Sequence, residues 1–241
     1  MIRAVLLALL LAGCQHQQAA TCALPVNPTM LQQSGDSHGP DGKLLQVWEV
    51  QNDPVLWSTA TPRDPNYQDF LTKLDRTGIG TDPLALLSAS PTPNSDLVAR
   101  NARDWIKPAG CLEKLLIGHQ HGRMDTFAAP TEFASLVLRS PDEDRLRIYY
   151  YTINQDGIGR ASPITEPAMV DLQAGWRLAV ALHNHAFHPG QPKLNGITAP
   201  SEPDADFNVN LAASGLEQAW ITNGLHTVRI PASAFSQFSV N

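Results

Sequence analysis

Residues 175–185, GWRLAVALHNH, are the stretch on which the predicted fold rests. The apolar run up to Leu182 is typical of a β-strand, and it leads directly into His183-Asn184-His185. Successive side chains of a strand point to opposite faces of the sheet, so the two histidines share one face. The stretch therefore predicts a strand whose end presents two imidazole rings to a single cation.

A third ligand has to come from another segment, and residues 200–204, PSEPD, offer one. Asp204 begins a predicted helix over residues 204–216 and is well placed to complete the set, although Glu202 and Asp206 flank it and could replace it. Two imidazoles and one carboxylate suit Zn²⁺. Three protein ligands leave the fourth position open, which is the arrangement of a hydrolytic site.

The two stretches resemble the signature of the JAMM metallopeptidases, which have the JAB/MPN fold. That signature is an upstream Glu, then His-x-His, then Ser-x-x-Asp. This chain has His183-x-His185 and Ser201-x-x-Asp204, and Glu132 leads the apolar run over residues 133–138. The resemblance covers roughly residues 111–235. It implies an α/β fold of the cytidine-deaminase-like kind, with a mixed α+β sheet flanked by helices.

The resemblance also implies a role for each matching residue. His183, His185 and Asp204 would hold one Zn²⁺ per chain. Glu132 would be the general base, and Ser201 would donate a hydrogen bond to the oxyanion of the tetrahedral intermediate. The implied activity is zinc-dependent hydrolysis of an amide or isopeptide bond.

The chain departs from the family pattern at two places. Ala186 follows the second histidine, where the family commonly has proline. Fifteen residues separate His185 from Ser201, against seven in the usual signature. A loop can absorb this insertion without moving the ligands, because the entropy cost of closing a loop rises slowly with its length. The insertion should lie beside the metal and affect substrate access.

The first fourteen residues, MIRAVLLALLLAGC, predict export. Arg3 precedes a short apolar run, and Leu11-Ala12-Gly13-Cys14 resembles the lipobox of bacterial lipoproteins. Residues 1–13 would be removed, and lipid on Cys14 would attach the protein to a membrane of the cell envelope. Gln15 favours the outer membrane by resemblance to enteric sorting. The substrate is then expected to be a peptide or protein of the envelope.

Composition and cysteine content agree with an exported protein that does not bind nucleic acid. Arg3 is the only charged residue among residues 1–13. The rest of the chain therefore has 23 acidic residues and 16 of the 17 basic ones, an excess of negative charge that argues against binding to nucleic acid. Cys22 and Cys111 remain once Cys14 is assigned to lipid, and an oxidising compartment favours a disulfide between them. The alternative is a pair of buried free thiols.

Hydrophobic patterns divide the mature chain into three parts. Residues 14–43 have the composition of a lipid-anchored tether, and the patterns over residues 44–110 predict a mainly helical extension. Residues 111–241 would be the JAB/MPN-like catalytic domain that the resemblance implies. Strands are expected over 44–50, 112–121, 133–139, 145–153, 175–182, 218–222 and 226–230, with a hairpin at Asn223-Gly224. Helices are expected over 67–76, 82–87, from Asn94 or Ser95 to 105, and over 204–216.

Two questions stay open at the level of sequence. His119-Gln120-His121 is a second His-x-His pattern, which could hold another metal, line the cleft or make local hydrogen bonds. The function also has alternatives to a peptidase. One is a non-catalytic JAB/MPN-like lipoprotein that binds a protein or metal partner in the envelope. Another is a metal-delivery lipoprotein, suggested by the eight histidines.

Overall fold

The computed structural model describes residues 22–36, 38–39, 41–157 and 163–238. The predicted signal peptide, residues 1–13, and the predicted lipidation site Cys14 lie outside the described residues. Within the described ranges, none of the helices has the length and apolar character needed to cross a membrane.

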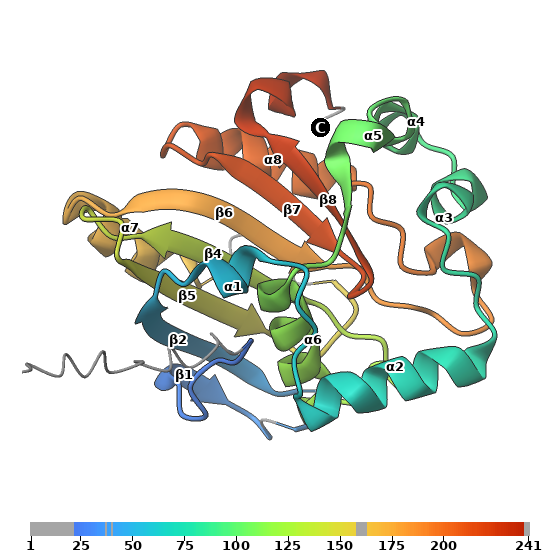
Figure 1. Cartoon of the computed structure of the whole chain (residues 1–241), viewed down its shortest axis with the longest axis horizontal. Helices are drawn as coiled ribbons and strands as arrows, with labels where there is room; N and C mark the ends of the chain where they lie inside the picture. Colours follow the sequence, from blue (N-terminus) through green and yellow to red (C-terminus); the bar gives the residue numbers. More distant parts are fainter. Residues whose placement is uncertain (1–21, 37, 40, 158–162, 239–241) are drawn as a thin grey trace, which may run out of the picture.

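One mixed sheet of eight strands organises the described part of the chain, in the order β1-β2-β5-β4-β6-β7-β8-β3 (Figure 1). Neighbouring strands are antiparallel except β6 and β7, which are parallel. The strands are β1 (Thr29–Ser34), β2 (Lys43–Gln51), β3 (Ile106–Pro108), β4 (Phe133–Arg139), β5 (Arg145–Thr152), β6 (Arg177–Asn184), β7 (Gln218–Thr222) and β8 (His226–Pro231).

Eight α-helices accompany this sheet in the described ranges. They are α1 (Pro54–Trp57), α2 (Pro65–Thr77), α3 (Pro83–Ala89), α4 (Pro93–Arg100), α5 (Ala102–Trp105), α6 (Cys111–Arg123), α7 (Thr165–Gln173) and α8 (Glu202–Ala212). Short 3₁₀ turns cover Pro192–Leu194 and Ala232–Gln237. Helices α1 to α4 each begin at a proline that follows an Asp or Thr N-cap, which is the arrangement that helix starts favour.

Apolar side chains cover both faces of the sheet. One layer, here called the α6 layer, holds residues of α2 and α6 together with sheet residues such as Val137, Tyr150 and Leu182. The opposite layer, here called the α8 layer, holds residues of α4, α7 and α8 with sheet residues such as Leu136 and Ala181. Strands buried on both faces are apolar at successive positions instead of alternating, and β4 follows this pattern.

The structure confirms the mixed α/β class and most of the predicted elements. The strands predicted near residues 44–50, 133–139, 145–153, 175–182, 218–222 and 226–230 are β2, β4, β5, β6, β7 and β8. Gly224 lies in the turn between β7 and β8 with φ at 86°, a conformation that glycine adopts readily. The predicted helices are present as well, but the third begins after Thr92 and is interrupted at Asn101.

The prediction of a strand over residues 112–121 is wrong, because this segment lies within helix α6. Ten of the thirteen residues of α6 are buried, including Leu112 and Leu116, which are fully buried. The buried residues of α6 include polar and charged ones, such as Glu113 and Gln120, so polar and apolar residues do not separate onto two faces and the helical period is lost.

The parts predicted as tether and extension contribute to the same sheet. Residues 29–34, within the predicted tether, form the exposed edge strand β1, which pairs with β2. Strand β2 pairs with β5, and β3 pairs with β8. The boundary predicted at residue 110 therefore does not separate two sheets.

Cys22 and Cys111 form the predicted disulfide, with their Cα atoms 5.7 Å apart. Both residues are buried, and Cys111 is the first residue of α6. The bond attaches the N-terminal end of the described chain to that helix.

Candidate metal centre

The candidate site lies where β6 ends and α8 begins. The chain leaves β6 after His183-Asn184, passes through the insertion, and returns as α8 before it enters the parallel neighbour β7. In such a β-α-β connection the helix starts near the carboxyl end of the first strand, which is where open α/β sheets commonly bind ligands. The connection thus brings Asp204, in the first turn of α8, to His183 and His185.

The three predicted ligands converge in the structure. The Nε2 atoms of His183 and His185 lie 3.2 Å apart. Asp204 Oδ2 lies 3.4 Å from His183 Nε2 and 3.3 Å from His185 Nε2. One ligand atom from each residue lies within 4.8 Å of the other two, so the group can hold a metal ion, and no other such group occurs among the described residues.

Two of these three residues, His185 and Asp204, are oriented by partners outside the group. The Nδ1 atom of His185 is hydrogen bonded to the carbonyl oxygen of Ile197, so that Nε2 points toward Asp204. Histidines that bind metals commonly use the second ring nitrogen in this way. Ser201 caps α8: its Oγ donates to Asp204 Oδ2 at 2.6 Å and accepts from the Asp204 backbone N–H at 3.3 Å. The residue expected to be an oxyanion donor thus also holds a ligand.

Glu132 lies beside these residues. Residue 134 of β4 pairs with His183, so continuing the antiparallel register places Glu132, just before β4, opposite His185. Its backbone N–H donates to Gln155 at 3.0 Å, and its carbonyl accepts from Thr152 Oγ1 at 2.9 Å. Burial raises the pKa of the Glu132 carboxyl, while the charges of His185 and His183 act to lower it.

The ionisable groups of the site shift one another's pKa values. Burial by itself would raise the pKa of Asp204, but His183 and His185 hold it well below its usual range. Burial would also lower the pKa of His185, but the hydrogen bond to Asp204 and the charge of Glu132 raise it to about 9. The buried carboxyl groups of Asp204 and Glu132 therefore favour positive charge on His185, and a divalent cation would supply such a charge.

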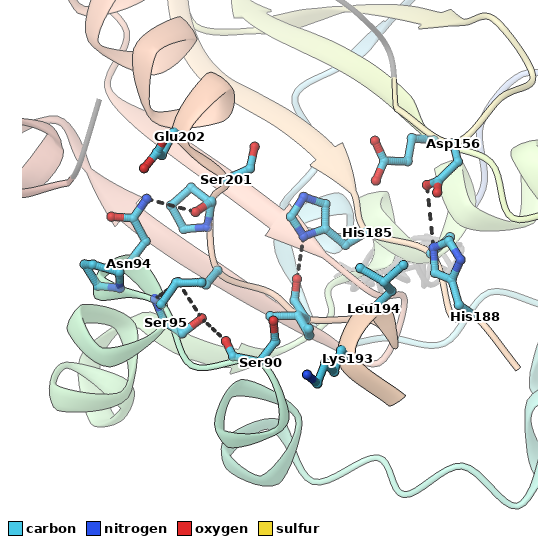
Figure 2. A pocket seen from close by; sticks show the side chains of 17 residues that line it. Ser90, Asn94, Ser95, Asp156, His185, His188, Lys193, Leu194, Ser201 and Glu202 are labelled. Carbon is cyan, nitrogen blue, oxygen red and sulfur yellow. Dashed lines mark hydrogen bonds and ion pairs between the residues drawn. The ribbon is translucent and has the colours of Figure 1, made fainter. Parts of the chain in front are cut away.

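A cleft of about 420 Å³ opens beside His185 (Figure 2). Three parts of the chain line it: residues 90–95 from the α3–α4 region, Glu132 with Asp156, and residues of the 186–202 segment. In Figure 2, Ser201 and Glu202 lie on one side of His185, and Asp156 and His188 lie on the other. His188 Nε2 lies 3.5 Å from Asp156 Oδ1.

The insertion borders this cleft and does not fill it. Ala186, His188, Lys193, Leu194 and Ile197 all contribute to the lining. The opposite wall, residues 90–95, belongs to the segment that the resemblance leaves unexplained. The caps in that segment predicted a helix start, but no sequence pattern indicated that it would line a cleft beside His185.

The other candidate residues lie outside the ligand group. His119 and His121 are on helix α6, where residues two apart point in different directions. His119 Nε2 is hydrogen bonded to Gln46 Oε1 at 2.8 Å, and His121 contacts Thr126 and Asp69. They have local hydrogen-bonding roles. Glu202 lines the cleft without joining the ligands, and Asp206 does neither.

No family model, curated protein or solved structure matches this chain. The functional argument therefore rests on the residues of the site and their geometry.

Proposed function

We propose that this protein is a zinc-dependent amide hydrolase of the JAMM type. The observation that carries the proposal is the convergence of His183, His185 and Asp204 on one point with Glu132 beside them. Two nitrogens and one oxygen are the donor set of many catalytic zinc sites, which keep one position for water or substrate.

The arrangement of elements supports the JAB/MPN assignment. Helix α6 precedes Glu132, which leads into the buried strand β4. Strand β6 then ends at the His-x-His pattern, α8 begins at Ser-x-x-Asp, and the next core strand, β7, runs parallel to β6. This is the order in which the family signature places its residues, and the eight-stranded sheet accommodates it together with three additional strands, β1 to β3.

Zinc held by these ligands would polarise a scissile carbonyl and make water a stronger nucleophile near neutral pH. The chain's own residues would handle the proton. Glu132, whose pKa burial raises, is suited to accept a proton from the attacking water and pass it to the leaving amine. Ser201 lines the cleft, and its Oγ would orient Asp204. The same hydroxyl would donate to the oxyanion if its hydrogen bond to Asp204 rearranges.

The proposed substrate is a peptide or protein of the cell envelope, where lipid on Cys14 would retain the enzyme. The cleft has the size of an ordinary ligand pocket, about 300–1,000 Å³. Its lining combines apolar residues, such as Leu194 and Ile197, with polar ones, such as Asn94 and Ser95. Asp156, Lys193 and Glu202 add charged groups to the lining, so the cleft suits an extended peptide that carries polar or charged side chains as well as apolar ones.

Metal analysis combined with a digest of a mixed peptide library tests this proposal. Purified mature protein should contain about one zinc per chain and generate new peptide termini detectable by mass spectrometry. Glu132→Gln should retain the zinc and lose cleavage, whereas the matched control Glu202→Gln, which lines the same cleft without facing the ligands, should retain both. Folded protein without metal would disprove the proposal. Zinc without cleavage would favour a non-catalytic docking lipoprotein.

A further inference from the structure

Asn184 stands between the two histidines in the sequence, but its side chain points to the other face of the sheet. Ala181 lies in the α8 layer and Leu182 in the α6 layer, so the alternation of β6 directs His183 and His185 toward α8 and Asn184 toward α6. Asn184 is 2% exposed. A buried amide requires hydrogen-bond partners, and those of Asn184 show what its side chain holds in place.

Both partners of Asn184 are backbone groups that flank Glu132. The Phe133 N–H donates to Asn184 Oδ1 at 2.7 Å, and Asn184 Nδ2 donates to the Thr131 carbonyl oxygen at 3.1 Å. Only one orientation of the amide satisfies an N–H on one side and a C=O on the other. The side chain therefore holds the backbone on both sides of the proposed base.

Glu132 needs such support because it lies outside the strand pairing. The β4–β6 pairs begin at Ala134 with His183, so the backbone ladder between these strands does not include residue 132. The remaining contacts of the Glu132 backbone go to Gln155 and Thr152, on the side of β5. Asn184 supplies the connection on the side of the metal ligands.

A chain of buried hydrogen bonds fixes Thr131, the residue before Glu132. Gln120 Nε2 on α6 donates to Thr131 Oγ1 at 2.8 Å, and the Tyr150 hydroxyl donates to Gln120 Oε1. Thr131, Gln120 and Tyr150 are all buried. A fully satisfied buried network is rigid, since any displacement leaves a polar group without a partner.

We propose that Asn184 is the positioning residue for Glu132: through its two backbone hydrogen bonds it sets the distance between the base and the metal held by the neighbouring histidines. The inference rests on the proposed function. The histidines do not need Asn184, because β4 and β7 pair with His183 and the His185 N–H donates to Thr222 at 2.9 Å. Removing the Asn184 side chain should therefore leave metal binding intact and alter only the position of Glu132.

Acetohydroxamate provides a test that needs no known substrate. It binds a catalytic metal through two oxygens and gives up a proton that a neighbouring carboxylate can accept. Its dissociation constant, measured from the visible spectrum of Co²⁺-loaded protein, therefore reports where Glu132 lies. We expect Asn184→Ala and Glu132→Gln each to weaken binding by roughly tenfold while Co²⁺ remains at one per chain.

The double variant separates positioning from a general loss of structure. If Asn184 acts through Glu132, then Asn184→Ala should have no further effect in the Glu132→Gln background. Tyr67→Phe is the control, because it too disrupts buried side-chain bonding to backbone, here the single bond from Tyr67 Oη to the Gly224 carbonyl oxygen at 2.8 Å. It should lower the free energy of unfolding and leave acetohydroxamate binding unchanged.

The outcomes that overturn the inference are separate from failure of the proposed function. Asn184→Ala with wild-type acetohydroxamate affinity, with reduced Co²⁺ content, or with an undiminished effect in the double variant would each refute it. If Asn184→Ala does not fold, Asn184→Asp, which keeps the acceptor for Phe133 and loses the donor to Thr131, is judged by the same criteria. Wild-type protein that binds no metal would refute the proposed function instead.

Discussion

The Nε2 atoms of His183 and His185 lie 3.2 Å apart and both face Asp204 Oδ2. Two ring nitrogens this close require a proton or a cation between or beside them, because their lone pairs otherwise repel. The first-turn carboxylate of α8 adds negative charge at the same point. A metal ion that binds at this point would replace the protons held there. Zinc binding should therefore affect both the stability of the fold and its response to pH.

Zinc should stabilise the folded protein. A ligand that binds only the native state adds about 2.7 kcal/mol at a free concentration 100 times its dissociation constant. For a chain of this size that corresponds to a rise in unfolding temperature of roughly 5–10 °C. Thermal unfolding with and without a chelator measures it. His185→Ala should abolish the rise, while His119→Ala, which lies outside the ligand group, should retain it.

Zinc affinity should increase with pH across the neutral range. The pKa of His185 is raised to about 9, so below that pH zinc has to displace a proton from this ring. Each pH unit from 6 to 8.5 should strengthen binding by up to about tenfold. Competition against a chromophoric chelator measures the slope. His188→Gln, a cleft histidine that is not a ligand, should leave the slope unchanged, and a flat profile would contradict the assignment of His185.

Ser201→Ala should affect stability and metal binding together. The hydroxyl caps α8 and donates to Asp204, so its loss should cost about 1 kcal/mol in the free energy of unfolding and weaken zinc binding. Ser201→Thr keeps both bonds and should behave like wild type. Urea unfolding and zinc titration measure these effects. If Ser201→Ala lost only hydrolysis, the oxyanion role would be its main one.

Replacing both cysteines of the disulfide should destabilise the fold without disturbing the metal ligands. Cys22 and Cys111 are 89 residues apart, and a cross-link over such a distance restricts the unfolded chain by about 2–4 kcal/mol. The Cys22→Ser, Cys111→Ser protein should unfold at lower urea and bind zinc normally. Wild-type protein treated with reductant is the control and should match it. Equal stability of oxidised and reduced protein would contradict this expectation.

The strands that carry the site could be predicted from sequence because their patterns are local. Strands β4 and β6 are short apolar runs, and the turn at Asn223-Gly224 requires a positive φ at Gly224, which glycine adopts readily. Helix α6 and strand β1 could not. Helix α6 is buried on nearly all sides, which removes its periodicity. Strand β1 is exposed at every residue, so only its pairing with the distant β2 makes it a strand.

The residues of the candidate site could also be predicted only in part. His183, His185, Ser201, Asp204 and Glu132 could be named from the sequence because their types and order resemble a signature, although the segment between His185 and Ser201 is longer than in that signature. The cleft wall at residues 90–95 and the role of Asn184 could not. Both depend on which distant segments come together, and no local pattern contains that information.

The Cys22–Cys111 bond also determines how the fold would respond to mechanical force. Strand β1 lies at the edge of the sheet and pairs with β2 alone, so it would detach first if the chain were pulled from its N-terminal side. The bond lies before β1 in the chain, so tension applied upstream of Cys22 passes directly to Cys111 and the start of α6. The edge strand then carries none of the load. A chain held by its N-terminal end could be pulled repeatedly without its sheet being opened from that edge.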